Sequence, residues 1–156
     1  MRVEIETIIS TLQENTDFCI YTHIKPDGDA VGSAFGLALA LQKLGKKVCV
    51  RCQDPWPHKF QDLVEEFVPD IVKDEVGIAV DVSSAQRLGI YEKADILLCI
   101  DHHMSNPCLF ENTFLKDEVS CTSIIFRLLE KMMCPVPADV TLGLYYVYVY
   151  MLFSAV

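Results

Sequence analysis

Three short clusters of polar side chains carry the residue types that bind metal ions and transfer protons. In chain order they are His23-Ile24-Lys25-Pro26-Asp27-Gly28-Asp29, Asp81-Val82-Ser83-Ser84 and Asp101-His102-His103. Mixed imidazole and carboxylate ligands suit Mn²⁺ or a similar first-row ion. The clusters hold more of these ligands than one metal site uses, and a bridging carboxylate with His and Asp on either side is what a two-metal hydrolytic centre requires. The chemistry that these residues predict is therefore metal-assisted hydrolysis of a phosphoester.

Each cluster directly follows a short apolar run that predicts a buried strand. These runs cover residues 18–22, 77–80 and 96–100. In an open α/β sheet, ligands bind beyond the carboxyl ends of the strands. We therefore expect the three clusters to meet in one crevice.

The rest of the chain alternates between strand and helix patterns in the same way. Further strands are expected at residues 48–52 and 113–115, helical turns at 84–88 and 90–93, and helices at 3–15, 30–44, 59–67 and 120–133, the last with Ser120 as its N-cap. Short apolar strands that alternate with helices call for a sheet covered on both faces. The sequence predicts a single α/β domain built on a doubly wound, mostly parallel sheet.

The cluster residues also have simpler interpretations. Asp29 precedes an expected helix whose positive end would favour an anionic substrate, but it could serve only as the cap of that helix. Asp27-Gly28 could be only a turn. Asp81 could be a loop carboxylate, and His102 with His103 a hydrogen-bonded surface pair. The predicted site would be absent only if all of these simpler interpretations held at once.

Composition limits the classes of protein that remain. The chain has 156 residues, of which 51% are hydrophobic, so it can bury a core without a disulfide or metal and is not disordered. It carries 13 Lys and Arg against 22 Asp and Glu, a net charge of -9. This balance argues against binding long duplex nucleic acid, which requires clustered cations. A small or metal-bridged phosphate ligand is compatible with it.

Cysteine usage and the chain ends indicate a cytoplasmic protein with reduced thiols. Seven cysteines do not form a typical disulfide framework, and the acidic start of the chain lacks the features of an export signal. Cys49 and Cys52 form a Cys-x-x-Cys without a second pair, inside an expected strand that would point them to opposite faces. The apolar end, residues 142–156, is too short for a membrane span, and its Tyr/Val alternation favours a strand.

Two of the motifs resemble those of the DHH phosphoesterase family. The run from Thr22 to Ser33 is similar to the first motif of that family, and Asp101-His102-His103 is the triplet that names it. Ala79-Val80-Asp81, Arg87-Leu88-Gly89 and Met104-Ser105-Asn106 are similar to the NrnA-type branch. The resemblance implies an enzyme that hydrolyses short RNA oligonucleotides or 3′-phosphoadenosine 5′-phosphate. Its partners would be these substrates, with no membrane, and a homodimer stays open.

The resemblance also implies a role for each residue of the site. His23 and Asp27 would hold one Mn²⁺ ion, Asp29 and His102 a second, and Asp81 would bridge both. His103 would contact the substrate phosphate. Asp101 would orient the neighbouring imidazoles.

The end of the chain departs from the family pattern. Gly143-Leu144-Tyr145 begins the fourth motif correctly, but Met151 stands about where the family has another metal-binding Asp. We therefore expect a DHH domain over residues 1–145, a divergent or scrambled tail over 146–156, and no second, DHHA1-type substrate-binding domain. A shift of the reading frame after Tyr145 would explain the change, and divergence is the alternative.

Two other functions remain open from the sequence. The chain could be a non-catalytic remnant that keeps the fold and one metal ion. It could also be an aspartyl-phosphate phosphatase with Asp27-Gly28-Asp29 as its Asp-x-Asp motif. The second ranks last, because His23 occupies the position directly after the strand that the nucleophilic Asp would need.

Overall fold

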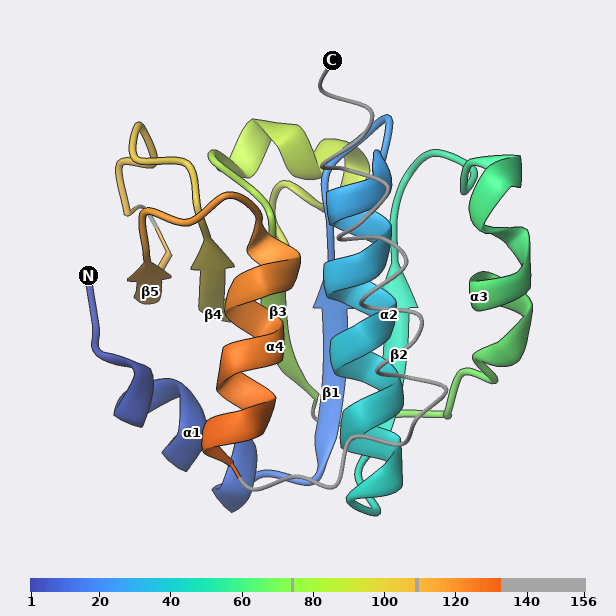
Figure 1. The fold of residues 1–156 in the computed structure, drawn as a ribbon, viewed down its shortest axis with the longest axis horizontal. Helices are drawn as coiled ribbons and strands as arrows, with labels where there is room; N and C mark the ends of the chain where they lie inside the picture. The colour runs from blue at the N-terminus through green and yellow to red at the C-terminus, as the bar shows by residue number, and fades with distance from the viewer. Residues whose placement is uncertain (74, 109, 133–156) are drawn as a thin grey trace.

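Five parallel strands form one sheet in the computed structural model, which describes residues 1–73, 75–108 and 110–132 (Figure 1). The strands are β1 (Asp17–Tyr21), β2 (Lys47–Arg51), β3 (Val76–Val80), β4 (Ile96–Asp101) and β5 (Asn112–Leu115). Their order across the sheet is β2-β1-β3-β4-β5. The strand that follows β1 in the chain lies on one side of it, and the later strands lie on the other side. Sheets of this order bind ligands at the switch point between β1 and β3, where the direction of strand addition changes.

The helices lie mainly over one face of this sheet. They are α1 (Ile5–Glu14), α2 (Gly28–Lys43), α3 (Gln61–Glu66) and α4 (Cys121–Lys131), with the 3₁₀ helices η1 (His58–Phe60) and η2 (Ala85–Tyr91). Figure 1 shows α2 and α4 side by side in front of the strands, and the two helices are in contact. α2 is buried along almost its whole length, from Gly28 to Leu41. A helix that is apolar on every side requires such a central position.

Strand residues alternate between two apolar layers, as the period of a strand requires. Large side chains, such as Phe18 of β1 and Ile78 of β3, face the layer shared with α2 and α4. Smaller ones, such as Cys19 and Ala79, face the opposite layer, where Leu88 of η2 covers them.

The predicted fold class is confirmed, and all five strands are parallel. Ser120 caps α4 as predicted, because its side chain accepts a hydrogen bond from the Ser123 N–H. The expected boundaries at residues 145 and 146, the fourth motif and Met151 lie outside the described residues.

Two predicted helices differ from the structure. The helix expected from Val3 begins only at Ile5, because the Val3 N–H donates to the Thr113 carbonyl (2.9 Å) and the N-terminal residues run beside β5. The helix expected over 59–67 is divided into η1 and α3. Phe60, with φ −114° and ψ 15°, interrupts the helical geometry between them.

The cysteines of the Cys-x-x-Cys pair have separate environments. Cys49 is buried in β2, with its Sγ 2.6 Å from Sγ of Cys19 on β1. Cys52 lies just beyond β2 and its Sγ donates to the His23 carbonyl (3.3 Å). No disulfide occurs among the described cysteines. Within the same part of the chain, no helix is long and apolar enough to cross a membrane.

Candidate metal centre

The three polar clusters lie together at the carboxyl edge of the sheet. β1, β3 and β4 are adjacent in the sheet, so the residues that follow them come out side by side. His23 follows β1, Asp81 follows β3, and His102 with His103 follows β4. The edge at which they meet includes the switch point between β1 and β3.

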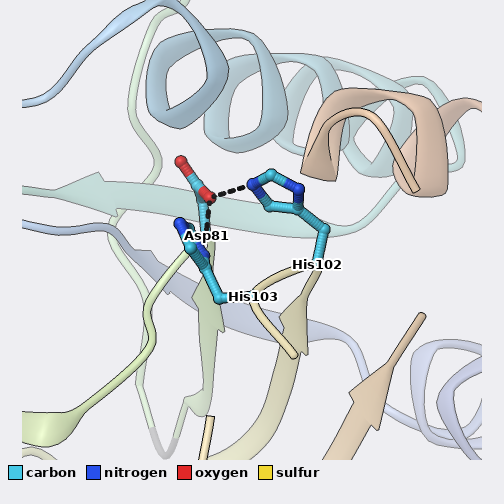
Figure 2. Close-up of side chains that lie close together, drawn as sticks. All are labelled: Asp81, His102 and His103. Carbon is cyan, nitrogen blue, oxygen red and sulfur yellow. Dashed lines mark ion pairs between the residues drawn. The ribbon is translucent and has the colours of Figure 1, made fainter. Parts of the chain in front are cut away.

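Asp81 is the centre of this group. One of its oxygens, Oδ2, lies 3.5 Å from His23 Nε2. The other, Oδ1, lies 3.5 Å from His102 Nε2 and 3.7 Å from His103 Nδ1. Figure 2 shows the imidazoles of His102 and His103 directed at the same oxygen of Asp81. Three imidazoles from two strand ends therefore face one buried carboxylate.

Two further features of Asp81 are typical of a functional residue. Its φ of 57° lies in the left-handed region, which few residues other than Gly occupy, although Asp tolerates it better than most. Its Oδ1 atom is buried and has no hydrogen-bond partner. Leaving a buried acceptor unpaired costs about 1–3 kcal/mol, and more when it is charged. A cation bound beside Oδ1 would remove that penalty, so this atom fits a metal site.

The described residues contain two groups that could hold a metal ion, and Asp81 belongs to both. One consists of Asp81, His102 and His103, and the other of His23, Asp27 and Asp81. Within each group, the ligand atoms lie within 4.8 Å of one another. The shared carboxylate between two groups is the arrangement that a two-metal centre requires.

The imidazoles of His23 and His102 are held in the orientation that metal binding needs. His23 Nδ1 lies 2.8 Å from the Ile24 carbonyl, and His102 Nδ1 lies 3.1 Å from the Glu118 carbonyl. A carbonyl oxygen can only accept, so Nδ1 of each ring carries a proton and Nε2 is the free nitrogen. In both residues Nε2 faces Asp81. A ring fixed through its far nitrogen is typical of metal-binding histidines.

His103 is oriented differently, through the buried Asp101. Its Nδ1 donates to Asp101 Oδ1 (2.7 Å), and its side chain is 44% exposed. Asp101 also accepts from the His102 backbone N–H (2.9 Å) and from Asn106 Nδ2 (2.8 Å). With Nδ1 committed to Asp101, the nitrogen that His103 has left for another partner is Nε2.

Asp27 and Asp29 have distinct positions in the first motif. Asp27 is the N-cap of α2, because its Oδ1 accepts from the N–H groups of Asp29 and Ala30. Its side chain is exposed and lies 3.9 Å from His23 Nε2. Asp29 is not the cap of α2. It is buried in the first turn, with Oδ2 3.5 Å from His102 Nε2.

The electrostatics of the site favour added positive charge. The Asp81 carboxylate raises the pKa of His102 to about 9. Burial opposes ionisation of Asp81, but His102 and His23 outweigh it and lower the pKa of Asp81. Burial, and then the charge of Asp81, raise the pKa of Asp29. In the metal-free protein a protonated His102 lies 3.5 Å from both carboxylates, as an ion pair longer than a good hydrogen bond, and a divalent cation would replace its proton.

Two residues that contact the site were not predicted from the sequence. Thr122, in the first turn of α4, donates to Asp29 through both its N–H and its hydroxyl (2.7 Å each). Asn106 links Asp101 to the Val82 carbonyl, which follows β3. Asn106 lies in a motif of the family resemblance, but that motif assigns it no role. No local signal points to Thr122, because its contact crosses 93 positions of the chain.

The chain is similar to two curated relatives of one name. It is 35% identical over 91 residues to the bifunctional oligoribonuclease and PAP phosphatase NrnA of Thermus thermophilus, which covers 56% of this chain and 28% of that relative. It is 28% identical over 110 residues to the protein of the same name from Mycoplasma pneumoniae, which covers 64% of this chain and 34% of that relative. The match spans about a third of the length of these relatives.

Two solved structures have a similar fold. An exopolyphosphatase-related protein from Bacteroides fragilis matches with a TM-score of 0.75 and 21% identity, over 90% of this chain and 47% of that one. CDC45 from Entamoeba histolytica matches with a TM-score of 0.56 and 14% identity, over 92% of this chain and 33% of that one. At these identities the likeness shows the fold alone.

The sequence model of the DHH family, N-terminal domain, matches residues 17–147 of this chain. That span contains all three polar clusters and every strand of the sheet. The chain therefore belongs to the DHH family.

Proposed function

We propose that this chain is the metal-binding domain of a phosphoesterase that hydrolyses short oligoribonucleotides or 3′-phosphoadenosine 5′-phosphate. The observation that carries the proposal is the unpaired Oδ1 atom of the buried Asp81, which the imidazoles of both His102 and His103 face. The names of the Thermus thermophilus and Mycoplasma pneumoniae relatives support the choice of substrates.

The site residues fit two Mn²⁺ ions on either side of Asp81. His23 and Asp27 would hold one ion, and Asp29 and His102 the other. Both histidines face Asp81 with Nε2, and their Nδ1 atoms are already bound to backbone carbonyls. Two bound cations would offset the charge of the substrate phosphate and activate a water molecule for attack on phosphorus.

His103 would contact the substrate phosphate through Nε2, the nitrogen left free by its bond to Asp101. The carboxylate of Asp101 keeps the proton on Nδ1 of His103 and holds the plane of the ring. A His103 that is also protonated at Nε2 could donate to a phosphate oxygen there. Asp101 is fully buried and does not contact solvent, so we propose that it acts by orienting His103.

We expect this chain to hold at most one Mn²⁺ ion tightly, with the second metal site weakened, and to hydrolyse dinucleotides slowly. Met151 stands where the resemblance expects a further metal-binding Asp. A site that lacks one carboxylate ligand binds a hard cation less tightly, because fewer charges offset the loss of hydration.

The test is a Mn²⁺ titration by calorimetry together with hydrolysis of an RNA dinucleotide and of 3′-phosphoadenosine 5′-phosphate. Asp81→Asn should abolish both Mn²⁺ binding and any turnover. The matched control is Asp62→Asn, at an exposed position on α3 away from the site. If Asp81→Asn binds Mn²⁺ as tightly as the unaltered chain, the proposed metal centre is wrong.

A non-catalytic domain that binds metal is the second candidate, because of Met151. It makes a different prediction in the same experiment. Mn²⁺ would bind and depend on Asp81, while neither substrate would be hydrolysed at any Mn²⁺ concentration.

A further inference from the structure

We propose that Thr122 is a positioning residue, whose hydroxyl turns the Asp29 carboxylate so that Oδ2 faces the metal centre. The inference rests on the proposed function, in which Asp29 and His102 hold one cation. Thr122 lies in the first turn of α4 and is 1% exposed. It touches neither substrate nor metal in this scheme and acts only through Asp29.

The two oxygens of Asp29 have unequal surroundings. Oδ1 accepts from the Thr122 N–H and the Thr122 hydroxyl, both at 2.7 Å, and lies 3.4 Å from Ser33 Oγ. Oδ2 accepts from the Cys121 N–H at 2.7 Å. Three donors therefore surround Oδ1 and one contacts Oδ2. The oxygen with free acceptor capacity is Oδ2.

That free oxygen is the one that faces the site. Asp29 Oδ2 lies 3.5 Å from His102 Nε2, and the same nitrogen lies 3.5 Å from Asp81 Oδ1. Rotation of the Asp29 carboxyl group would exchange its two oxygens or turn both away from His102. The Thr122 hydroxyl opposes this rotation, because it donates a hydrogen bond from a fixed, buried position to Oδ1, the oxygen that does not face the site.

The hydroxyl is not needed to begin α4. Ser120 already caps the helix by accepting from the Ser123 N–H (3.0 Å). The N–H groups of Cys121 and Thr122 bond Asp29 through the backbone, so they are satisfied whatever side chain occupies position 122. A substitution that removes only the hydroxyl therefore changes how Asp29 is held and leaves the helix start in place.

The test compares Thr122→Val, which keeps the shape and loses the donor, with Thr122→Ser, which keeps the donor. The full chain carries Asp27→Asn throughout, which weakens the His23 side, so that the tighter binding step in calorimetry reports Mn²⁺ on the Asp29 and His102 side. Asparagine is as good an N-cap as aspartate, so α2 is retained. The matched control is Thr113→Val on β5, a fully buried threonine whose hydroxyl donates to the Phe110 carbonyl.

Thr122→Val should weaken Mn²⁺ binding by about tenfold to a hundredfold, the usual effect of losing a partner that orients a metal ligand. Thr122→Ser should restore most of the affinity. Thr113→Val should lower the melting temperature and leave Mn²⁺ affinity unchanged. If Thr122→Val does not fold, Thr122→Cys takes its place, because its thiol is a weaker donor and should give an intermediate loss.

An unchanged Mn²⁺ affinity in Thr122→Val, or in Thr122→Cys, would overturn the inference, because the hydroxyl would then serve stability alone. Failure of Thr122→Ser to restore affinity would overturn it as well. If the Asp27→Asn parent binds no Mn²⁺ while the unaltered chain does, the inference fails and the proposed function stands. If the unaltered chain binds none, both fail.

Discussion

His102 Nε2 lies 3.5 Å from Asp81 Oδ1, too far for a strong hydrogen bond between them. Neighbouring ligand atoms that each lie about 2.1 Å from one ion are about 3.0 Å apart in octahedral geometry and about 3.4 Å apart in tetrahedral geometry. The separation of Asp81 Oδ1 and His102 Nε2 is thus close to that of two ligands of one cation. Their backbones set this separation, since Asp81 follows β3 and His102 follows the adjacent strand β4.

The position of Asp81 in both candidate groups predicts different effects for two Asp→Asn substitutions. Asp81→Asn should remove Mn²⁺ binding on both sides, whereas Asp27→Asn should weaken only the His23 side. Both variants should fold, because Asn at position 27 can still cap α2 and Asn at position 81 tolerates the left-handed backbone there. Calorimetric Mn²⁺ titration checks this prediction. Equal losses in the two variants would show that Asp81 is not shared.

Mn²⁺ affinity should rise with pH through the range in which His102 loses its proton. Asp81 raises the pKa of His102 from 6.5 to about 9 in the metal-free protein, and a ligating imidazole must be neutral. Below that pKa, each displaced proton should weaken binding by about tenfold per pH unit. Titrations across this range check the slope, and His102→Gln should flatten it.

The same shift predicts how the stability of the metal-free protein depends on pH. The folded pKa of His102 is raised above its unfolded value, so its contribution is fully present below about pH 6.5 and is lost as the pH rises through about 9. Thermal melts with a chelator present should show this loss. The difference in melting temperature between the unaltered chain and His102→Gln separates the contribution of His102 from that of other groups. A difference that does not change with pH would contradict the prediction.

Asp101→Asn should reduce the preference of neutral His103 for a proton on Nδ1. Asp101 Oδ1 accepts from Nδ1 at 2.7 Å and from the His102 N–H at 2.9 Å, and an Asn amide either keeps a weaker, uncharged acceptor there or turns its NH₂ group toward both donors. Long-range ¹H–¹⁵N correlation spectra of the metal-free protein identify the protonated nitrogen of each ring. His23 is the internal control, because its Nδ1 is bound to the Ile24 carbonyl and should keep its proton. An unchanged His103 spectrum would argue against the orienting role of Asp101.

Gly77→Ala should destabilise the domain strongly. A Cβ at position 77 would lie 2.1 Å from the backbone oxygen of Asp95, which cannot move without distorting the start of β4. We expect a loss of about 3 kcal/mol or failure to fold. Gly45→Ala is the control, because it meets no atom within 4 Å and carries only the strain of φ +78°. Its cost should be about 1–2 kcal/mol, and urea unfolding measures both. Similar losses would contradict the contact at Gly77.

Local sequence patterns were sufficient to predict most of the elements. Apolar runs of three to five residues predicted the strands, and polar residues directly after three of them were the candidate ligands, because side chains at a strand end lie at the ligand-binding edge of such a sheet. The first motif and the Asp-His-His triplet were sufficient to suggest the family that residues 17–147 match.

The sequence by itself determined which residue types are available to the site, and the tertiary structure decided how each of them is used. The sequence offered Asp29 as the possible cap of α2 and Asp27-Gly28 as a turn, but Asp27 has the extended backbone of the cap and Asp29 is buried against α4. The strand order that brings Asp81 between His23 and His102 follows from packing across the whole sheet. So does the contact between Asp29 and Thr122, because a hydrogen bond over 93 positions depends on where two helices meet and leaves no periodicity in the chain.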